Sequence, residues 1–348
     1  NKGISTKSGV ELEPFTFLFK ISGQVLTSNY KNLCGEFSTE NDESIHHCNL
    51  NFDSPVNYQQ FAVTVINNPM PEFIFITPHY LTNTLAYLMI MDNYGIPIYY
   101  KKYNTTVTEF KKQFNGLLTF YDHSSLKFIE MDSSYKAVDN YKCGNGYNTD
   151  GHDLLVLQNG HSFLMSYDPQ TVRMDTIVAG GDPQAVVYGL VIQELDANKN
   201  VIFQWRSWDH FQITDATYDI DLTQHVIDYV HGNSIEVDYD NNLLISSRNM
   251  DEITKIDRQT GDILWRFGGL YSKNNQFQFI GDPVTFSHQH DVRRIANGNI
   301  TLFDNGSLHT PPVSRSLEYQ LDEINKIAVL VWKYNNNPTT FEPTRGSS

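Results

Sequence analysis

Four short segments follow one another between residues 234 and 266: Ser234-Ile-Glu-Val-Asp238, Leu243-Leu-Ile-Ser-Ser247, Ile253-Thr-Lys-Ile-Asp257 and Asp262-Ile-Leu-Trp-Arg266. Each is rich in the β-branched, aliphatic and aromatic residues that favour strands. Asn241-Asn242 and Gln259-Thr-Gly261 stand between neighbouring segments and are typical of tight turns. This stretch therefore predicts four strands joined by tight turns in one antiparallel sheet.

Looser copies of this unit recur at residues 154–205 and 291–332, and two more can be traced at 73–99 and 117–138. Four strands repeated with a period of about 40–55 residues are typical of β-propeller blades. A β-sandwich with hairpins of similar spacing is the alternative, but sandwiches rarely repeat their turn chemistry in register. We therefore expect an all-β propeller with five traceable blades.

Residues 1–68 precede the first traceable blade and are predicted to form a small N-terminal β appendage. Residues 69–348 are then the propeller and catalytic domain. Cys34 and Cys48 of the appendage are expected to form a disulfide, whereas Cys143 is predicted to be a buried thiol. A disulfide fits an exported protein better than a cytosolic one.

The charge balance narrows the range of partners. The 348 residues carry 25 Lys and Arg against 40 Asp and Glu, a net charge of −15. Such a chain repels nucleic acid and anionic membrane surfaces. The longest apolar run, residues 85–91, is far shorter than the ~20 residues that a membrane-spanning helix needs. We expect small-molecule ligands, no nucleic acid and no membrane span.

Three histidines stand at equivalent places in three of the repeats. His152, His231 and His290 each lie just ahead of a predicted first strand, and first strands line the central channel of a propeller. Asn233 and Arg248 can reach the same channel mouth. A lone histidine beside a strand is more often a hydrogen-bonded structural side chain, but the shared register favours one cationic pocket suited to a small anion such as a phosphate or sulfate group.

Two other features leave alternatives open. His288 and His290 are two residues apart, so both could chelate a metal from one strand face; no carboxylate is well spaced to join them, and we expect neither a metal nor a cofactor. Residues 205–221 form a long insertion, followed by a possible short helix at 222–230. Its Trp205 and Trp208 either line a substrate pocket or fill the gap between blades.

At these residues the chain resembles the bacterial-type arylsulfotransferase family, whose members move a sulfuryl group between phenols without the adenylyl-sulfate cofactor. The resemblance runs from about residue 73 to the end. It rests on six segments in order: Asp150-Gly-His-Asp153, His231-Gly-Asn-Ser234, Leu244-Ile-Ser-Ser-Arg248, Gln289-His-Asp291, Phe303-Asp-Asn-Gly306 and Ser314-Arg315. It implies a six-bladed propeller whose last blade is incomplete in this chain, and a secreted or periplasmic location.

The resemblance also implies roles for individual residues. The nucleophile of the family matches His290, which would form a sulfohistidine intermediate, and the supporting residues match His152, His231, Asn233 and Arg248. Arg248, His231 and Asn233 would stabilise charge on the sulfuryl oxygens, and His152 or His231 would exchange a proton with the phenol. The matched segments further place Asn305 and Arg315 as substrate-binding residues.

The expected activity is therefore sulfuryl transfer from an aryl sulfate to a phenol. An aryl sulfate hydrolase would use the same pocket with water as the acceptor. A non-catalytic propeller of the secreted or cell-surface type would use the ring for binding or structure. The sequence is also compatible with a homo-oligomer.

Overall fold

The computed structural model describes residues 72–78, 86–93, 95–336 and 338–347. These residues fall into two compact units, which meet along the chain between Tyr141 and Lys142. The predicted appendage at residues 1–68, with Cys34 and Cys48, lies outside the described residues. Cys143 is a buried free thiol, as predicted.

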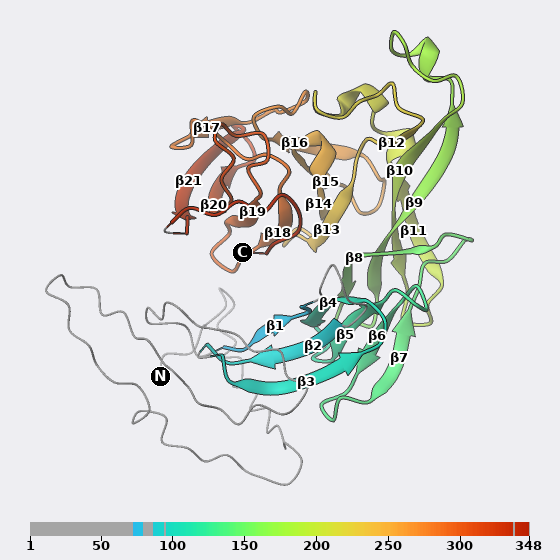
Figure 1. The fold of residues 1–348 in the computed structure, drawn as a ribbon, viewed down its shortest axis with the longest axis vertical. Coiled ribbons are helices and arrows are strands. Elements are labelled where there is room, and N and C mark those ends of the chain that lie inside the picture. Colours follow the sequence, from blue (N-terminus) through green and yellow to red (C-terminus); the bar gives the residue numbers. More distant parts are fainter. Residues whose placement is uncertain (1–71, 79–85, 94, 337, 348) are drawn as a thin grey trace, which may run out of the picture. The chain divides into compact units, whose positions relative to one another are not determined.

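The first unit contains two antiparallel sheets in which neighbouring strands follow chain order (Figure 1). One sheet has three strands: β1 (Ile74–Ile76), β2 (Ala86–Met91) and β3 (Pro97–Tyr103). The other has four: β4 (Val107–Lys112), β5 (Leu118–Asp122), β6 (Lys127–Met131) and β7 (Ala137–Tyr141).

The second unit contains three larger sheets, each built around four antiparallel strands in chain order. The first has β8 (Thr149–Val156), β9 (Ser162–Val172), β10 (Ala185–Leu195) and β11 (Val201–Arg206), with β12 (Val226–Asp228) added parallel to β10. The second has β13 (Gly232–Val237), β14 (Leu243–Ser247), β15 (Glu252–Ile256) and β16 (Ile263–Gly268). The third has β18 (His290–Arg294), β19 (Ile300–Asp304), β20 (Arg315–Asp322) and β21 (Ile327–Tyr334), with β17 (Gln278–Ile280) added parallel to β21.

Helical structure in the described part of the chain is limited to three-residue 3-10 turns: η2 (Met174–Thr176), η3 (Ser207–Asp209), η4 (Ile213–Asp215) and η5 (Arg248–Met250). The predicted helix at 222–230 is wrong, because β12 forms there instead. Its backbone pairs with the long edge of β10, and Ile227 is buried in the core. Tertiary pairing has overridden the local pattern in this segment.

Consecutive four-strand meanders are the arrangement of β-propeller blades, so the propeller class is confirmed. The described residues form five meander sheets, the first with three strands and the others built on four, and the expectation of six blades is corrected to five. The five correspond to the repeats traced in the sequence. The sixth was implied by the family resemblance alone and had no strands assigned to it.

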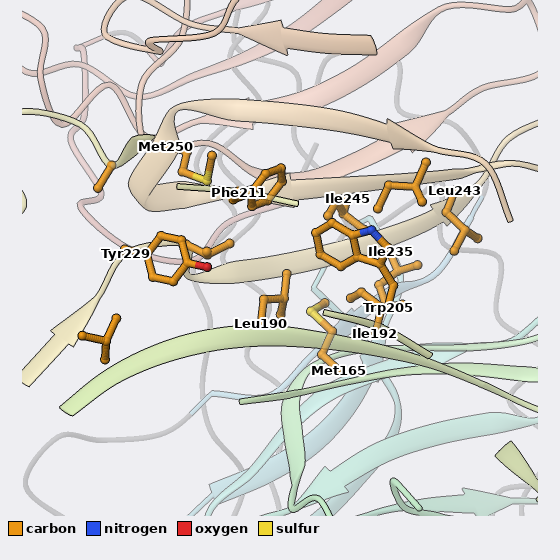
Figure 2. Packing of buried hydrophobic residues seen from close by; sticks show 14 of the residues in the cluster. Met165, Leu190, Ile192, Trp205, Phe211, Tyr229, Ile235, Leu243, Ile245 and Met250 are labelled. Atoms are coloured by element: carbon orange, nitrogen blue, oxygen red, sulfur yellow. The ribbon is translucent and has the colours of Figure 1, made fainter. Parts of the chain in front are cut away.

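The first two sheets of the second unit pack face to face through an apolar core (Figure 2). Met165, Leu190 and Ile192 come from one sheet, and Ile235 and Ile245 come from the other. Trp205 is 2% exposed among them, and Trp208 packs against the same core. These two tryptophans therefore fill the gap between blades.

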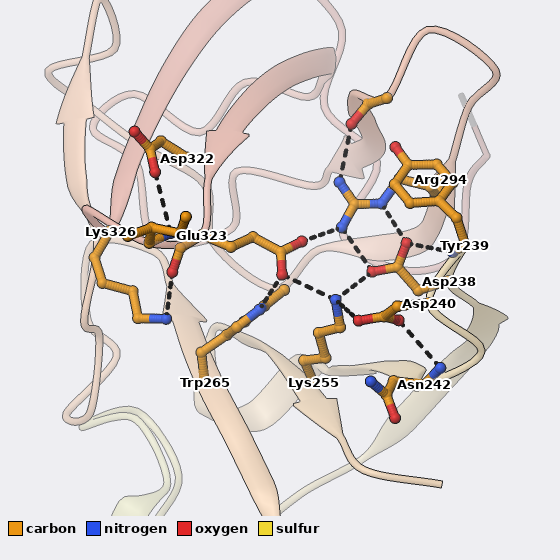
Figure 3. Close-up of polar contacts among 12 residues, drawn as sticks. Asp238, Tyr239, Asp240, Asn242, Lys255, Trp265, Arg294, Asp322, Glu323 and Lys326 are labelled. Carbon is orange, nitrogen blue, oxygen red and sulfur yellow. Dashed lines mark hydrogen bonds and ion pairs between the residues drawn. The ribbon is translucent and has the colours of Figure 1, made fainter. Parts of the chain in front are cut away.

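A buried ion-pair network joins the second and third of these sheets (Figure 3). Asp238 accepts two hydrogen bonds from Arg294, at 2.9 and 2.8 Å, and pairs with Lys255 Nζ at 2.8 Å. Glu323 binds both of these cations, at 2.6 and 2.9 Å. Burial alone would raise the pKa of Asp238, but the bonds from Arg294 and Lys255 lower it.

Replacing Lys255 with Ala should destabilise the protein, because it leaves the buried Asp238 short of one cation. Breaking a buried pair costs about 3–5 kcal/mol, and urea unfolding near neutral pH should show a loss of that size. The pKa of Asp238 is lowered on folding, so its contribution is lost as pH falls, and the difference from the parent protein should shrink in acid. The exposed Lys333 provides the control: Lys333→Ala should change the unfolding free energy by less than about 0.5 kcal/mol.

Candidate functional site

The first strands of the three sheets in the second unit, β8, β13 and β18, lie side by side, with β13 contacting both of the others. Each of these first strands has an irregularity where it pairs with the next strand of its sheet. The register shifts between Thr149 and Leu154, between Gly232 and Ser234, and between His290 and Arg293. Such bulges release residues from the ladder and re-aim their side chains. The released or flanking positions carry the predicted site residues His152, Asn233 and His290.

Several residues beside the bulges have left-handed backbone conformations. His231 has φ of 50°, His288 of 52° and Asp291 of 57°. These conformations are uncommon for residues other than glycine, and they concentrate at functional sites, where the surrounding structure enforces them. The backbone around the histidines is thus locally strained.

His290 is buried, with 6% of its surface exposed, and its partners fix its tautomer. Nδ1 faces two acceptors, the Asn305 side-chain oxygen at 2.7 Å and the His288 carbonyl at 3.1 Å. The Asn305 amide is itself oriented, because its Nδ2 donates to the carbonyls of Glu342 and Arg345. Nδ1 therefore carries the proton, and the Nε2 lone pair accepts a hydrogen bond from the Arg345 backbone N–H at 3.3 Å.

The surroundings keep the His290 ring neutral. The pKa of His290 is lowered to about 3, mainly by burial and also by the nearby His152 and His231, against the opposing effect of the Asn305 hydrogen bond. The neutral ring retains its lone pair on Nε2 at physiological pH, where it accepts the Arg345 N–H. Such a nitrogen is a competent nucleophile.

His152 and His231 form a second kind of environment. Their ring centroids are 5.1 Å apart, edge to face. Asp150 binds Nδ1 of His152 at 2.7 Å, and Asp228 binds Nδ1 of His231 at 2.6 Å. A carboxylate on Nδ1 orients the ring and fixes its tautomer, so each pair is suited to proton transfer at Nε2.

Asn233 supports the backbone next to His290. Its Nδ2 donates to the Gln289 carbonyl at 2.8 Å, and its buried Oδ1 has no hydrogen-bond partner among the described residues. The amide nitrogen that was expected to bind a sulfuryl oxygen is thus engaged with the protein.

Arg248 lies at the start of η5, directly after β14. It donates to the Asn249 side chain at 2.7 Å and to the Pro343 carbonyl at 3.4 Å. The segment from Glu342 to Arg345 thus contacts Arg248, His290 and Asn305 together, and it forms one wall of the site.

Arg315 has a different setting. Its guanidinium is buried against Asp282 and Asp304 and also donates to the Thr285 carbonyl. Burial opposes its charge, but these two carboxylates raise its pKa. The Arg315 side chain thus points into the protein, where it holds the end of β19 next to Asn305. It is not brought beside His152, His231 or His290.

Sequence reasoning missed the carboxylates. Asp150 and Asp228 stand two and three residues before their histidines, and this spacing was a readable signal. The contribution of Arg345 left no such signal, because it is made by a backbone N–H.

Two negative findings apply to the described part of the chain. It contains no group of three or more side chains placed to hold a metal ion. His288 Nε2 lies 3.2 Å from Asp219, so His288 and His290 have separate partners. The helical segments of the described residues are too short to cross a membrane.

Comparison with protein families gives a match over most of the chain. The model of the family described as Arylsulfotransferase (ASST) matches residues 58–346. No curated protein matches the chain.

Similarity to solved structures is weak. A protein of unknown function from Bacteroides caccae is 12% identical with a TM-score of 0.44, over 77% of this chain and 74% of that one. A catalytically inactive virginiamycin B lyase from Staphylococcus aureus, solved with quinupristin, is 11% identical with a TM-score of 0.38, over 79% and 76%.

The protonation of His290 can be checked by NMR of ring-labelled histidine. Because its pKa is lowered to about 3, the His290 signals should not change between about pH 8 and about pH 5, where an ordinary histidine titrates. Asn305→Asp would place a negative charge against Nδ1 and should raise the pKa of His290. Titration of wild-type His290 near pH 6.5, or an unchanged pKa in Asn305→Asp, would contradict this geometry.

Proposed function

The chain belongs to the arylsulfotransferase family, and we propose that it transfers a sulfuryl group from an aryl sulfate to a phenol through a covalent intermediate on His290. The observation that carries the proposal is the state of His290. Its ring is buried and neutral, its Nδ1 proton is held by Asn305, and its Nε2 lone pair faces the site wall. The proposed substrates are small molecules.

In the first step, Nε2 of His290 attacks the sulfur, an N–S bond forms, and the bond from sulfur to the aryl oxygen breaks. The electron pair of that bond leaves with the phenol oxygen, which takes a proton from His152 or His231. In the second step, an acceptor phenol returns its proton to the same histidine and attacks the sulfur, and the N–S bond breaks. Splitting one transfer into two easier steps is the advantage of covalent catalysis.

The charge on the sulfuryl oxygens needs donors near Nε2. The Arg345 N–H already points at Nε2 and would shift to a sulfuryl oxygen when the sulfur approaches. Arg248 binds the same wall and supplies a positive charge. In this scheme Asn233 acts on the Gln289 backbone, and through it on the position of His290.

The two histidine–aspartate pairs supply the proton that the leaving phenol needs. A phenol with a pKa near ~10 is a poor leaving group as the bare anion at neutral pH. General acid assistance from a positioned histidine typically contributes ~10²–10⁴-fold.

We also propose a secreted or periplasmic location, which the predicted disulfide between Cys34 and Cys48 supports.

Replacing His290 with Asn should abolish transfer from 4-nitrophenyl sulfate to phenol, because the nucleophile is lost. Intact-protein mass spectrometry of the wild type, without acceptor, should show a gain of about 80 Da on His290, and phenol should remove it. His225 is largely exposed and pairs with Asp182, so His225→Asn is the matched control and should retain full activity.

Three outcomes bear on this proposal. Transfer that persists in His290→Asn would contradict the proposed mechanism. Nitrophenol release that does not depend on the acceptor would identify a hydrolase. No release and no adduct in a folded protein would favour a binding or structural role.

A further inference from the structure

Tyr167 lies on β9 and has a buried hydroxyl without a hydrogen-bond partner among the described residues. Buried hydroxyls are nearly always paired, because an unpaired one loses its bonds to water and gains nothing in return. An exception in a native structure therefore needs an explanation. A ligand that accepts the hydrogen bond is one such explanation.

The pairing of the strands places Tyr167 beside the site. Its neighbour Ser166 pairs with Thr149 on β8, the residue just before Asp150 and the bulge that carries His152. The Tyr167 ring centroid lies 6.4 Å from that of His231 and 6.2 Å from that of Tyr188. Tyr167 thus stands next to both histidine–aspartate pairs.

The charges around Tyr167 define what its hydroxyl can do. Burial raises the pKa of Tyr167 well above its ordinary value, and Asp150 and Asp228 raise it further. The phenol therefore stays protonated and can donate a hydrogen bond. Each of the two carboxylates binds a histidine Nδ1, and neither accepts a hydrogen bond from Tyr167, so the donor remains available for a ligand oxygen.

We propose that Tyr167 is a substrate-binding residue whose hydroxyl donates a hydrogen bond to the phenolic oxygen of the aryl sulfate. This inference rests on the proposed function. The phenolic oxygen is favoured over the sulfuryl oxygens because Tyr167 neighbours His231, which with His152 would protonate that oxygen. The two carboxylates beside the hydroxyl also make this a poor place for an anionic sulfuryl group.

The test compares Tyr167→Phe with Tyr188→Phe, which makes the same change in the neighbouring ring. A hydrogen bond to an oxygen that gains charge strengthens during bond breaking. For phenyl sulfate, Tyr167→Phe should lower kcat/KM by about 10- to 100-fold. The loss should be smaller for 4-nitrophenyl sulfate, whose leaving oxygen holds less charge. Inhibition by inorganic sulfate should be unchanged, and Tyr188→Phe should behave as wild type.

Stability provides a second readout. Removing an unpaired buried hydroxyl should leave the unfolding free energy unchanged or raise it, whereas removing a structural hydrogen bond would lower it. A destabilised Tyr167→Phe would therefore overturn the proposal. So would equal losses for both aryl sulfates, or weaker sulfate inhibition, since these would assign the hydroxyl to the sulfuryl oxygens.

Failure of the proposed function can be told apart from failure of this inference. If wild-type protein releases no phenol from either aryl sulfate, the proposed function is overturned. Phenol binding, measured by calorimetry on wild type and Tyr167→Phe, then decides the role of Tyr167. About tenfold weaker binding in the variant supports it, and equal affinities overturn it.

Discussion

The arrangement of the site depends on one buried carboxylate. Asp153, on β8, accepts the backbone N–H of Ile235 on β13 at 2.8 Å and pairs with Arg293 on β18 at 3.0 Å. The first strands of separate blades share no backbone ladder, so side chains must fix their relative positions. Arg293 also donates to the Ile235 carbonyl, which closes the connection. The bulges of three sheets can converge because this contact holds their strands together.

One residue type acquires different properties from different surroundings in this site. His290 meets an amide and a carbonyl at Nδ1 and is deeply buried, so it stays neutral. His152 and His231 meet carboxylates at Nδ1 instead, which orient their rings. In the proposed mechanism the three imidazoles divide the roles of nucleophile and proton carrier without any change in amino acid. Position and partner decide the chemistry here.

The sequence was most informative where the local signal was strong. The turns at Asn241-Asn242 and Gln259-Thr-Gly261 located β13 to β16 closely, and the shared register of the histidines pointed to three rings that the structure brings near one another. Contacts between distant segments were not predictable. β12 forms because β10 offers an edge, which the pattern at 222–230 does not encode. The sequence suggests Arg315 as an anion ligand, but it does not encode the pairing of Arg315 with Asp282 and Asp304.

The bulges keep several candidate site residues out of the strand pairing that holds each sheet together. A residue that takes no part in the ladder, such as Asn233 or His152, can be exchanged without breaking a strand pair. The strands on either side continue their pairing regardless of what the bulge displays. A propeller built in this way can acquire a new reaction by substitutions at a few positions and keep its stability. Evolution of specificity in such a protein would therefore be limited less by the risk of unfolding than by the supply of useful side chains.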